Sequence, residues 1–152
     1  MNKILVSYFS ASGVTKTVAE KIAKSVGGDL FEIIPKEKYT EDDLNWMNKQ
    51  SRSSIEMNQN IKPQIVNKIT NIDDYDTIIL GFPIWWYKQP TIIDTFLEEN
   101  DMNDKNIYVF VTSGSSSIDS TYSSLQNNYP NLNFIKGKRF TANDDDYASW
   151  LL

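Results

Sequence analysis

The stretch Ile4-Leu5-Val6-Ser7-Tyr8-Phe9 leads directly into Ser10-Ala11-Ser12-Gly13-Val14-Thr15 near the start of the chain. Its first six residues are almost continuously apolar, which is typical of a strand buried on both faces. After the polar turn, apolar residues recur every four positions, at 14, 18, 22 and 26, as they do along one face of a helix. A buried strand, a polar turn and an amphipathic helix predict the first unit of an α/β domain.

The rest of the chain repeats this alternation of strand and helix. Apolar runs predict further strands at residues 30–34, 77–82 and 107–112 and a short strand at 134–135. Helical patterns follow at 92–97 and 118–125, and residues 144–152 predict a brief final helix in which Trp150 docks. We therefore expect one domain over residues 1–152, a doubly wound α/β fold with a five-stranded parallel sheet and helices on both faces.

Residues 36–71 form a long polar connection that is rich in Asn and Lys. Thr40 is a candidate cap for a short helix carrying Leu44 and Met47. The stretch that ends at Pro63 is expected to pass the sheet edge, and residues 65–69 are expected to form another helical piece. The whole segment could serve as a lid or as a docking surface.

The composition excludes several kinds of chemistry. The chain has no cysteine and no histidine, which removes thiolate nucleophiles, disulfides, Cys/His metal sites and a Ser-His-Asp triad. Redox chemistry would therefore require a bound organic cofactor. A net charge of −5 argues against nucleic acid or an anionic membrane as partner and favours a basic protein surface, although the acidity could also serve solubility alone. Without an apolar leader or span, a cytoplasmic and monomeric protein is expected.

Three loops follow predicted strands, and ligands of open α/β sheets bind at that edge. The first, Ser10-Ala11-Ser12-Gly13-Val14-Thr15, offers hydroxyl and N–H donors at a helix start, which suits a phosphate group. A plain N-cap turn would use the same residue types. We expect Lys16 to be a surface residue rather than a phosphate ligand.

The second loop, Gly81-Phe82-Pro83-Ile84-Trp85-Trp86-Tyr87-Lys88-Gln89-Pro90, is stiffened by a proline toward each end. Three successive aromatic residues cannot all point into one core, so at least one should face outward. An outward tryptophan is suited to stacking against a flat conjugated ring. The alternative is that Trp85 or Trp86 only covers the edge of the sheet.

The third loop, Thr112-Ser113-Gly114-Ser115-Ser116-Ser117, precedes another predicted helix. Gly114 could take the positive φ that turns successive N–H groups inward, toward carbonyl oxygens or an anionic ring nitrogen. An ordinary polar loop is the alternative. Three such loops at one crevice favour a ligand site over coincidence.

These motifs carry a resemblance to the flavodoxin family. Ser10, Ser12, Gly13 and Thr15 match the family's (Ser/Thr)-x-(Ser/Thr)-Gly-x-Thr phosphate loop. Further matches at residues 75–76, 81–86, 96–97 and 112–114 extend the resemblance over nearly the whole chain. The chain looks closest to a bacterial flavodoxin-like branch marked by Pro-Ile-Trp-Trp and by an Arg/Glu-bearing stretch before proline, here Arg52, Glu56 and Pro63.

The resemblance implies a non-covalently bound FMN, with its phosphate in the first loop and its isoalloxazine ring edged by the other two. The implied cofactor site comprises Ser10, Ser12, Gly13, Val14, Thr15, Pro83, Ile84, Trp85, Trp86, Tyr87, Thr112, Ser113, Gly114 and Ser115.

The sequence departs from the flavodoxin pattern at two places. Residues 85–89 contain no glycine, although flavodoxins often turn a peptide beside the flavin N5 at a glycine, so the required positive φ would be strained here. Ser115 and Ser116 also stand where more glycine is expected.

The resemblance implies an electron carrier that serves redox partner proteins, with no catalytic acid, base or nucleophile of its own. The rival is an FMN-dependent NAD(P)H or quinone reductase, in which residues 39–62 cover a substrate pocket and Arg52 steers an anionic or carbonyl group. A third alternative is a flavin-free interaction module. Motifs for dinucleotides, for Gly-Lys-Ser/Thr phosphate loops and for response-regulator receivers are absent from the sequence.

Overall fold

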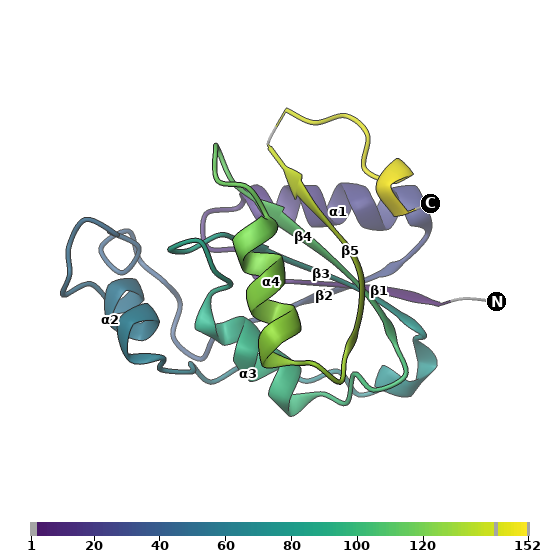
Figure 1. Cartoon of the computed structure of the whole chain (residues 1–152), viewed down its shortest axis with the longest axis horizontal. Coiled ribbons are helices and arrows are strands. Elements are labelled where there is room, and N and C mark those ends of the chain that lie inside the picture. Colours follow the sequence, from purple (N-terminus) through teal and green to yellow (C-terminus); the bar gives the residue numbers. More distant parts are fainter. Residues whose placement is uncertain (1–2, 142, 152) are drawn as a thin grey trace.

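The computed structural model describes residues 3–141 and 143–151 and is built on a five-stranded parallel sheet (Figure 1). The strand order is β2-β1-β3-β4-β5, and every neighbouring pair is parallel. The strands are β1 (Ile4–Tyr8), β2 (Asp29–Glu32), β3 (Thr77–Pro83), β4 (Asn106–Thr112) and β5 (Asn133–Phe140). The predicted five-stranded sheet is confirmed, but β5 has 8 residues rather than the two expected.

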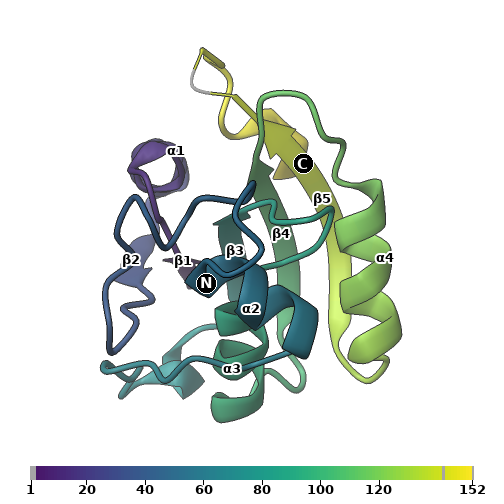
Figure 2. The same ribbon diagram turned by 90° about the vertical axis from the view of Figure 1, so that its left-hand side faces the viewer.

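Helices cover both faces of this sheet, as predicted (Figure 2). On one face α1 (Val14–Val26) and the C-terminal segment pack against Val6, Ile79 and Phe110. On the other face α3 (Thr91–Glu99) and α4 (Asp119–Asn128) pack against a second cluster that includes Leu5 and Leu80. Successive strand residues point to opposite faces, so the near-continuous apolar runs supply both cores. No described helix is long and apolar enough to cross a membrane.

The connection from β2 to β3 differs from its prediction. Thr40 Oγ1 accepts a hydrogen bond from the Asp43 N–H at 3.1 Å, but hydrogen-bonded turns follow instead of a helix. The helix predicted at 65–69 is also wrong, because Ile65 forms an isolated antiparallel bridge with Pro35. The actual elements are α2 (Arg52–Gln59) and a short 3₁₀ turn, η1 (Ile72–Asp74). In Figure 1, α2 lies to one side of the layers formed by the sheet and the other helices.

The C-terminal segment docks on the α1 face through Trp150, whose ring lies 5.9 Å from that of Tyr108 and 6.0 Å from that of Phe140. This docking is confirmed. The predicted helix from residue 144 is wrong, since the described helical turn, η2, covers only Ser149–Leu151, and residues 142 and 152 lie outside the described chain. Asp146, which accepts from the Ser149 N–H at 3.1 Å, provides the cap.

Candidate functional site

The first loop is organised by Ser10, at the carboxyl end of β1. Its Oγ accepts hydrogen bonds from the Gly13 N–H at 3.1 Å and from the Lys16 N–H at 3.2 Å. Gly13 is the N-cap of α1 with φ 99°, a conformation that favours glycine, and it has no side chain with which to cap the helix itself. Ser10 Oγ therefore takes only the Lys16 N–H of the first helical turn. An N-terminus of this kind presents unsatisfied N–H groups and a positive dipole end, so the loop fits an anion such as a phosphate.

Thr112 joins the first loop to the other two. Its Oγ1 lies 2.7 Å from Oγ1 of Thr15, and both side chains are buried. Its carbonyl accepts from the Ile84 N–H at 3.3 Å, which ties the second loop to the end of β4. The structure therefore brings the three predicted loops together at one edge of the sheet. The Thr15 hydroxyl is a buried link between loops there, rather than a freely exposed donor.

The second loop is a tight hairpin closed by Trp85 and Lys88. The Trp85 N–H donates to the Lys88 carbonyl at 3.0 Å, and the Lys88 N–H donates to the Trp85 carbonyl at 2.9 Å. Between them Trp86 and Tyr87 adopt φ of 48° and 63°. Two successive positive φ values define a two-residue hairpin turn that usually contains glycine. Positive φ therefore occurs here without glycine, and each of these residues carries a strain of roughly 1–3 kcal/mol.

Neighbouring elements fix this strained turn. Thr121 of α4 is fully buried, and its hydroxyl donates to the Tyr87 carbonyl at 3.1 Å. The Trp85 ring is partly buried and packs edge-on against Phe9 and Tyr39, whereas the side chains of Trp86 and Tyr87 are 37% and 67% exposed. The prediction that at least one aromatic faces outward is confirmed. Trp85 forms an inner wall at the sheet edge, and its two successors lie at the surface.

The third loop is ordered by Arg139 of β5, which the sequence reasoning missed. Its Nε donates to the Ser113 carbonyl at 3.2 Å, and its terminal nitrogen donates to the Gly114 carbonyl at 2.7 Å. Among the described glycines only Gly13 and Gly27 have positive φ, so the expectation for Gly114 is wrong. The guanidinium holds the loop carbonyls directly, and this removes the need for a left-handed glycine. No local pattern in the sequence marks Arg139 for this contact.

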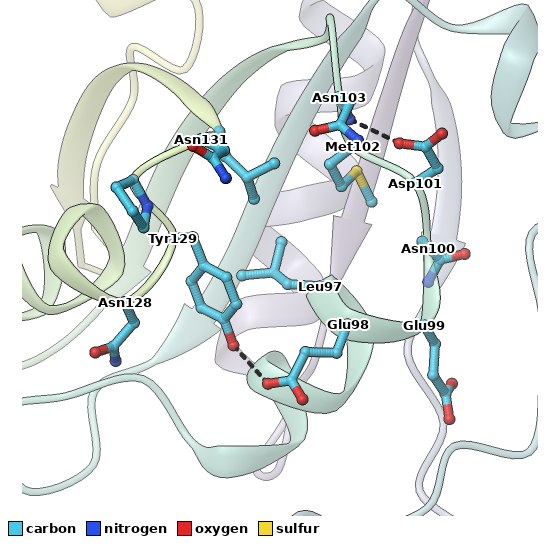
Figure 3. Close-up of a pocket in the computed structure, with 12 residues that line it drawn as sticks. Leu97, Glu98, Glu99, Asn100, Asp101, Met102, Asn103, Asn128, Tyr129 and Asn131 are labelled. Carbon is cyan, nitrogen blue, oxygen red and sulfur yellow. Dashed lines mark hydrogen bonds between the residues drawn. The ribbon is translucent and has the colours of Figure 1, made fainter.

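Gln89 anchors the end of the second loop to α3. Its buried amide donates to Asp94 at 3.1 Å, and the Tyr129 hydroxyl lies 2.8 Å from the same Asp94 oxygen and 2.9 Å from Glu98 (Figure 3 shows the latter contact). One hydroxyl proton cannot serve two carboxylates fully, so a proton on one carboxyl completes the network. Burial raises the pKa of Asp94, whereas the hydrogen bond from Lys62 lowers the pKa of Glu98. Of the two carboxyl groups, Asp94 is thus the one whose protonated form burial favours.

We expect Asp94→Asn to flatten the pH dependence of stability. A folded-state pKa raised above the ordinary 3.8 stabilises the fold below that pH, and the contribution is lost as the pH rises through the folded value. The unfolding free energy of the wild type, measured by urea denaturation relative to Asp94→Asn, should therefore fall from acid toward neutral pH. A difference that rises over this interval would contradict the assignment.

A cavity of about 560 Å³ lies at the opposite edge of the sheet, between the segments that precede β4 and β5 (Figure 3). Its lining includes Glu98, Asp101, Asn128 and Tyr129. None of the three loops contributes to it. Within residues 3–141 and 143–151 no cluster of three or more potential metal ligands occurs. The cavity is therefore separate from the three loops, which remain the candidate ligand site.

The strand order β2-β1-β3-β4-β5, with donor-rich loops at the carboxyl ends of β1, β3 and β4, defines a doubly wound α/β domain of the flavodoxin class. The family model described as flavodoxin matches residues 3–151. The chain belongs to the flavodoxin family.

Solved structures agree with this assignment. A candidate flavoprotein from Bacteroides eggerthii is 45% identical, with a TM-score of 0.95 over 99% of this chain and 96% of the other. A flavoprotein from Lactobacillus acidophilus in complex with FMN is 26% identical, with a TM-score of 0.77 over 91% and 93% of the two chains. An archaeal flavodoxin at 17% identity and a TM-score of 0.55, covering 91% and 82%, shares the fold. No curated protein matches the chain.

Proposed function

We propose that this protein binds one FMN non-covalently at the three loops and carries electrons between redox partner proteins. The observation that carries the proposal is the N-terminus of α1, whose turn is shaped by Ser10 and by Gly13 at the N-cap, beside the Trp85–Lys88 hairpin. An anion site next to an aromatic wall fits a phosphate joined to a flat ring. The FMN complex of the Lactobacillus acidophilus relative supports the same choice of cofactor.

The residues divide into two groups by their contribution. Ser10, Ser12, Gly13, Val14 and Thr15 would hold the phosphate, and residues 83–87 and 112–115 would edge the ring. When bound, FMN supplies one- and two-electron redox chemistry. The chain itself would shield the ring with the indoles of Trp85 and Trp86, would offer loop donors to its polar edge, and would leave the exposed Tyr87 at the surface where a partner approaches.

Arg52 supports the carrier over the reductase. Its guanidinium is held by Glu56 at 2.9 Å and by the Glu37 carbonyl at 2.8 Å, and it stacks on the Tyr39 ring. An arginine engaged in this way is poorly placed to steer a substrate. We propose a monomeric cytoplasmic carrier with a net charge of −5 that favours partners with a basic surface.

The test uses the purified FMN-loaded protein alone. Mixed with NADH or NADPH and a quinone, it should show negligible steady-state turnover. After reduction by dithionite without oxygen, it should pass electrons to cytochrome c, a basic protein acceptor, at a rate that falls with added salt. Sustained quinone reduction by NAD(P)H would favour the reductase instead.

Trp86→Ala should weaken FMN binding by about tenfold and raise the potential of the fully reduced couple. An indole against the ring contributes roughly 0.5–1.5 kcal/mol, and its removal admits water that stabilises the negative charge gained on full reduction. Trp46→Ala is the matched control, because Trp46 is an exposed tryptophan outside the three loops. Fluorescence titration and spectroelectrochemistry measure both quantities. Equal effects of the two substitutions would contradict a wall role for Trp86.

A further inference from the structure

We propose that Tyr39 is a positioning residue for the ring of Trp85, and that Arg52 and Glu56 of α2 hold Tyr39 in this role. The proposal rests on the proposed function, since it concerns the wall of the FMN site. It assigns a role to the long connection between β2 and β3, which is not part of any of the three loops.

Three aromatic rings meet at the carboxyl end of β1. Tyr39 and Trp85 have ring centroids 5.3 Å apart at 75°, Phe9 and Trp85 lie 5.7 Å apart at 87°, and Phe9 and Tyr39 lie 5.6 Å apart at 66°. Edge-to-face contacts at these distances are favourable and fix the ring planes relative to one another. Phe9 is 1% exposed and belongs to the core, so it is a rigid support. The plane of Trp85 therefore depends on Tyr39 as its second support.

Tyr39 is held on two sides. The Arg52 guanidinium carbon lies 3.8 Å from the centre of its ring, a cation–π contact. The Tyr39 hydroxyl donates to Glu56, whose side chain also accepts from Arg52 Nε at 2.9 Å. Burial and the Glu56 carboxylate raise the pKa of Tyr39 well above its ordinary value, so the hydroxyl stays a donor at any working pH. Both the ring face and the hydroxyl of Tyr39 are therefore fixed.

The composition of α2 indicates that the contacts of Arg52 and Glu56 fix the orientation of Tyr39 and do not only stabilise the fold. The buried residues of the helix are Ser53, Ser54 and Glu56, so it docks through polar contacts without an apolar stripe. Glu56 is only 5% exposed, and a buried ion pair stabilises a fold no better than well-packed apolar residues of the same volume. Directional contacts of this kind do fix orientation. α2 therefore fixes the orientation of Tyr39 through Arg52 and Glu56.

The first test follows Trp85 in the apoprotein. With 5-fluorotryptophan incorporated, the 4 tryptophans give separate ¹⁹F NMR signals, and Trp85→Phe assigns the one of interest. Tyr39→Leu should shift and broaden the Trp85 signal, while the Trp150 signal on the other face of the sheet stays unchanged. Tyr39→Phe keeps the ring and its contact with Arg52 but loses the hydrogen bond to Glu56, so its effect on the Trp85 signal should be smaller than that of Tyr39→Leu but still measurable. This readout does not require flavin, so it remains decisive even if the protein does not bind FMN.

The second test measures dissociation constants of FMN and riboflavin. Tyr39→Leu should raise both by about tenfold and by the same factor, because the ring wall changes and the phosphate loop does not. Arg52→Gln, at a partly exposed side chain, should raise both by about threefold. Unchanged Trp85 resonance in Tyr39→Leu, or affinity lost for FMN but not for riboflavin, would overturn the proposal. Failure of the wild type to bind either flavin would overturn the proposed function instead.

Discussion

Gly81→Ala should lower the free energy of unfolding by about 3 kcal/mol or more. A Cβ added to Gly81 would lie 1.9 Å from Cζ of Phe110, whose ring is fully buried against Phe140. The backbone cannot easily retreat, because the Gly81 carbonyl accepts from the Phe9 N–H at 3.0 Å and the residue pairs with strands on both sides. The overlap must therefore displace a packed aromatic ring. Urea denaturation followed by circular dichroism measures the loss.

Gly114→Ala is the matched control for this substitution. A Cβ at Gly114 meets nothing within 4 Å, and its φ is not positive. Its effect on the unfolding free energy should stay within about 0.5 kcal/mol. Similar losses from both substitutions would show that the close approach of β3 to the Phe110 ring is not what requires glycine.

Ser10→Ala should raise the dissociation constant for FMN by about tenfold. The lost Oγ accepts from the Gly13 and Lys16 N–H groups, and removing a side-chain cap from a helix start costs about 0.5–2 kcal/mol. The turn that presents the N-terminus of α1 would lose its shape, so phosphate binding would suffer most. Isothermal titration of the apoprotein measures the change.

Riboflavin binding distinguishes an effect on the phosphate loop from an effect on the aromatic wall. Because it has no phosphate, its affinity should change by no more than about twofold in Ser10→Ala. Ser25→Ala is the control variant, since Ser25 is an exposed serine near the other end of α1. Equal losses for FMN and riboflavin would mean that Ser10 supports the domain as a whole rather than the phosphate loop.

The sequence predicted the elements whose patterns are strongest. The near-continuous apolar runs of β1, β3 and β4 placed the central strands within a residue or two. β5 was underestimated because it is an edge strand, and its partly exposed residues Asn133–Phe140 include two lysines, one arginine and a glycine. α2 was missed because it lacks an apolar stripe and depends on its cap, where Ser51 accepts from the Ser54 N–H, and on Arg52 and Glu56.

In the candidate site, too, some features follow from neighbouring residues in the sequence, and others depend on residues far apart in it. The turn at Ser10 and Gly13 could be read from residue types, because helix starts have local chemistry. The contacts that order the other loops, from Thr121 and Arg139, join residues 34 and 25 or 26 positions apart. No local sequence pattern predicts contacts between residues so far apart. The strained positive φ in this glycine-free loop was suggested by the family resemblance, but its place at Trp86 and Tyr87 was not, because neighbouring elements impose it against the residues' own preference.

Titration of the apoprotein with FMN, followed by quenching of flavin fluorescence, tests the central claim most directly. We expect saturable binding of one FMN per chain and markedly weaker binding of riboflavin, because the N-terminus of α1 would hold only the phosphate of FMN. Binding should also quench tryptophan fluorescence in the wild type and less so in Trp86→Ala. A protein that takes up no FMN, or that binds riboflavin equally well, would contradict the account.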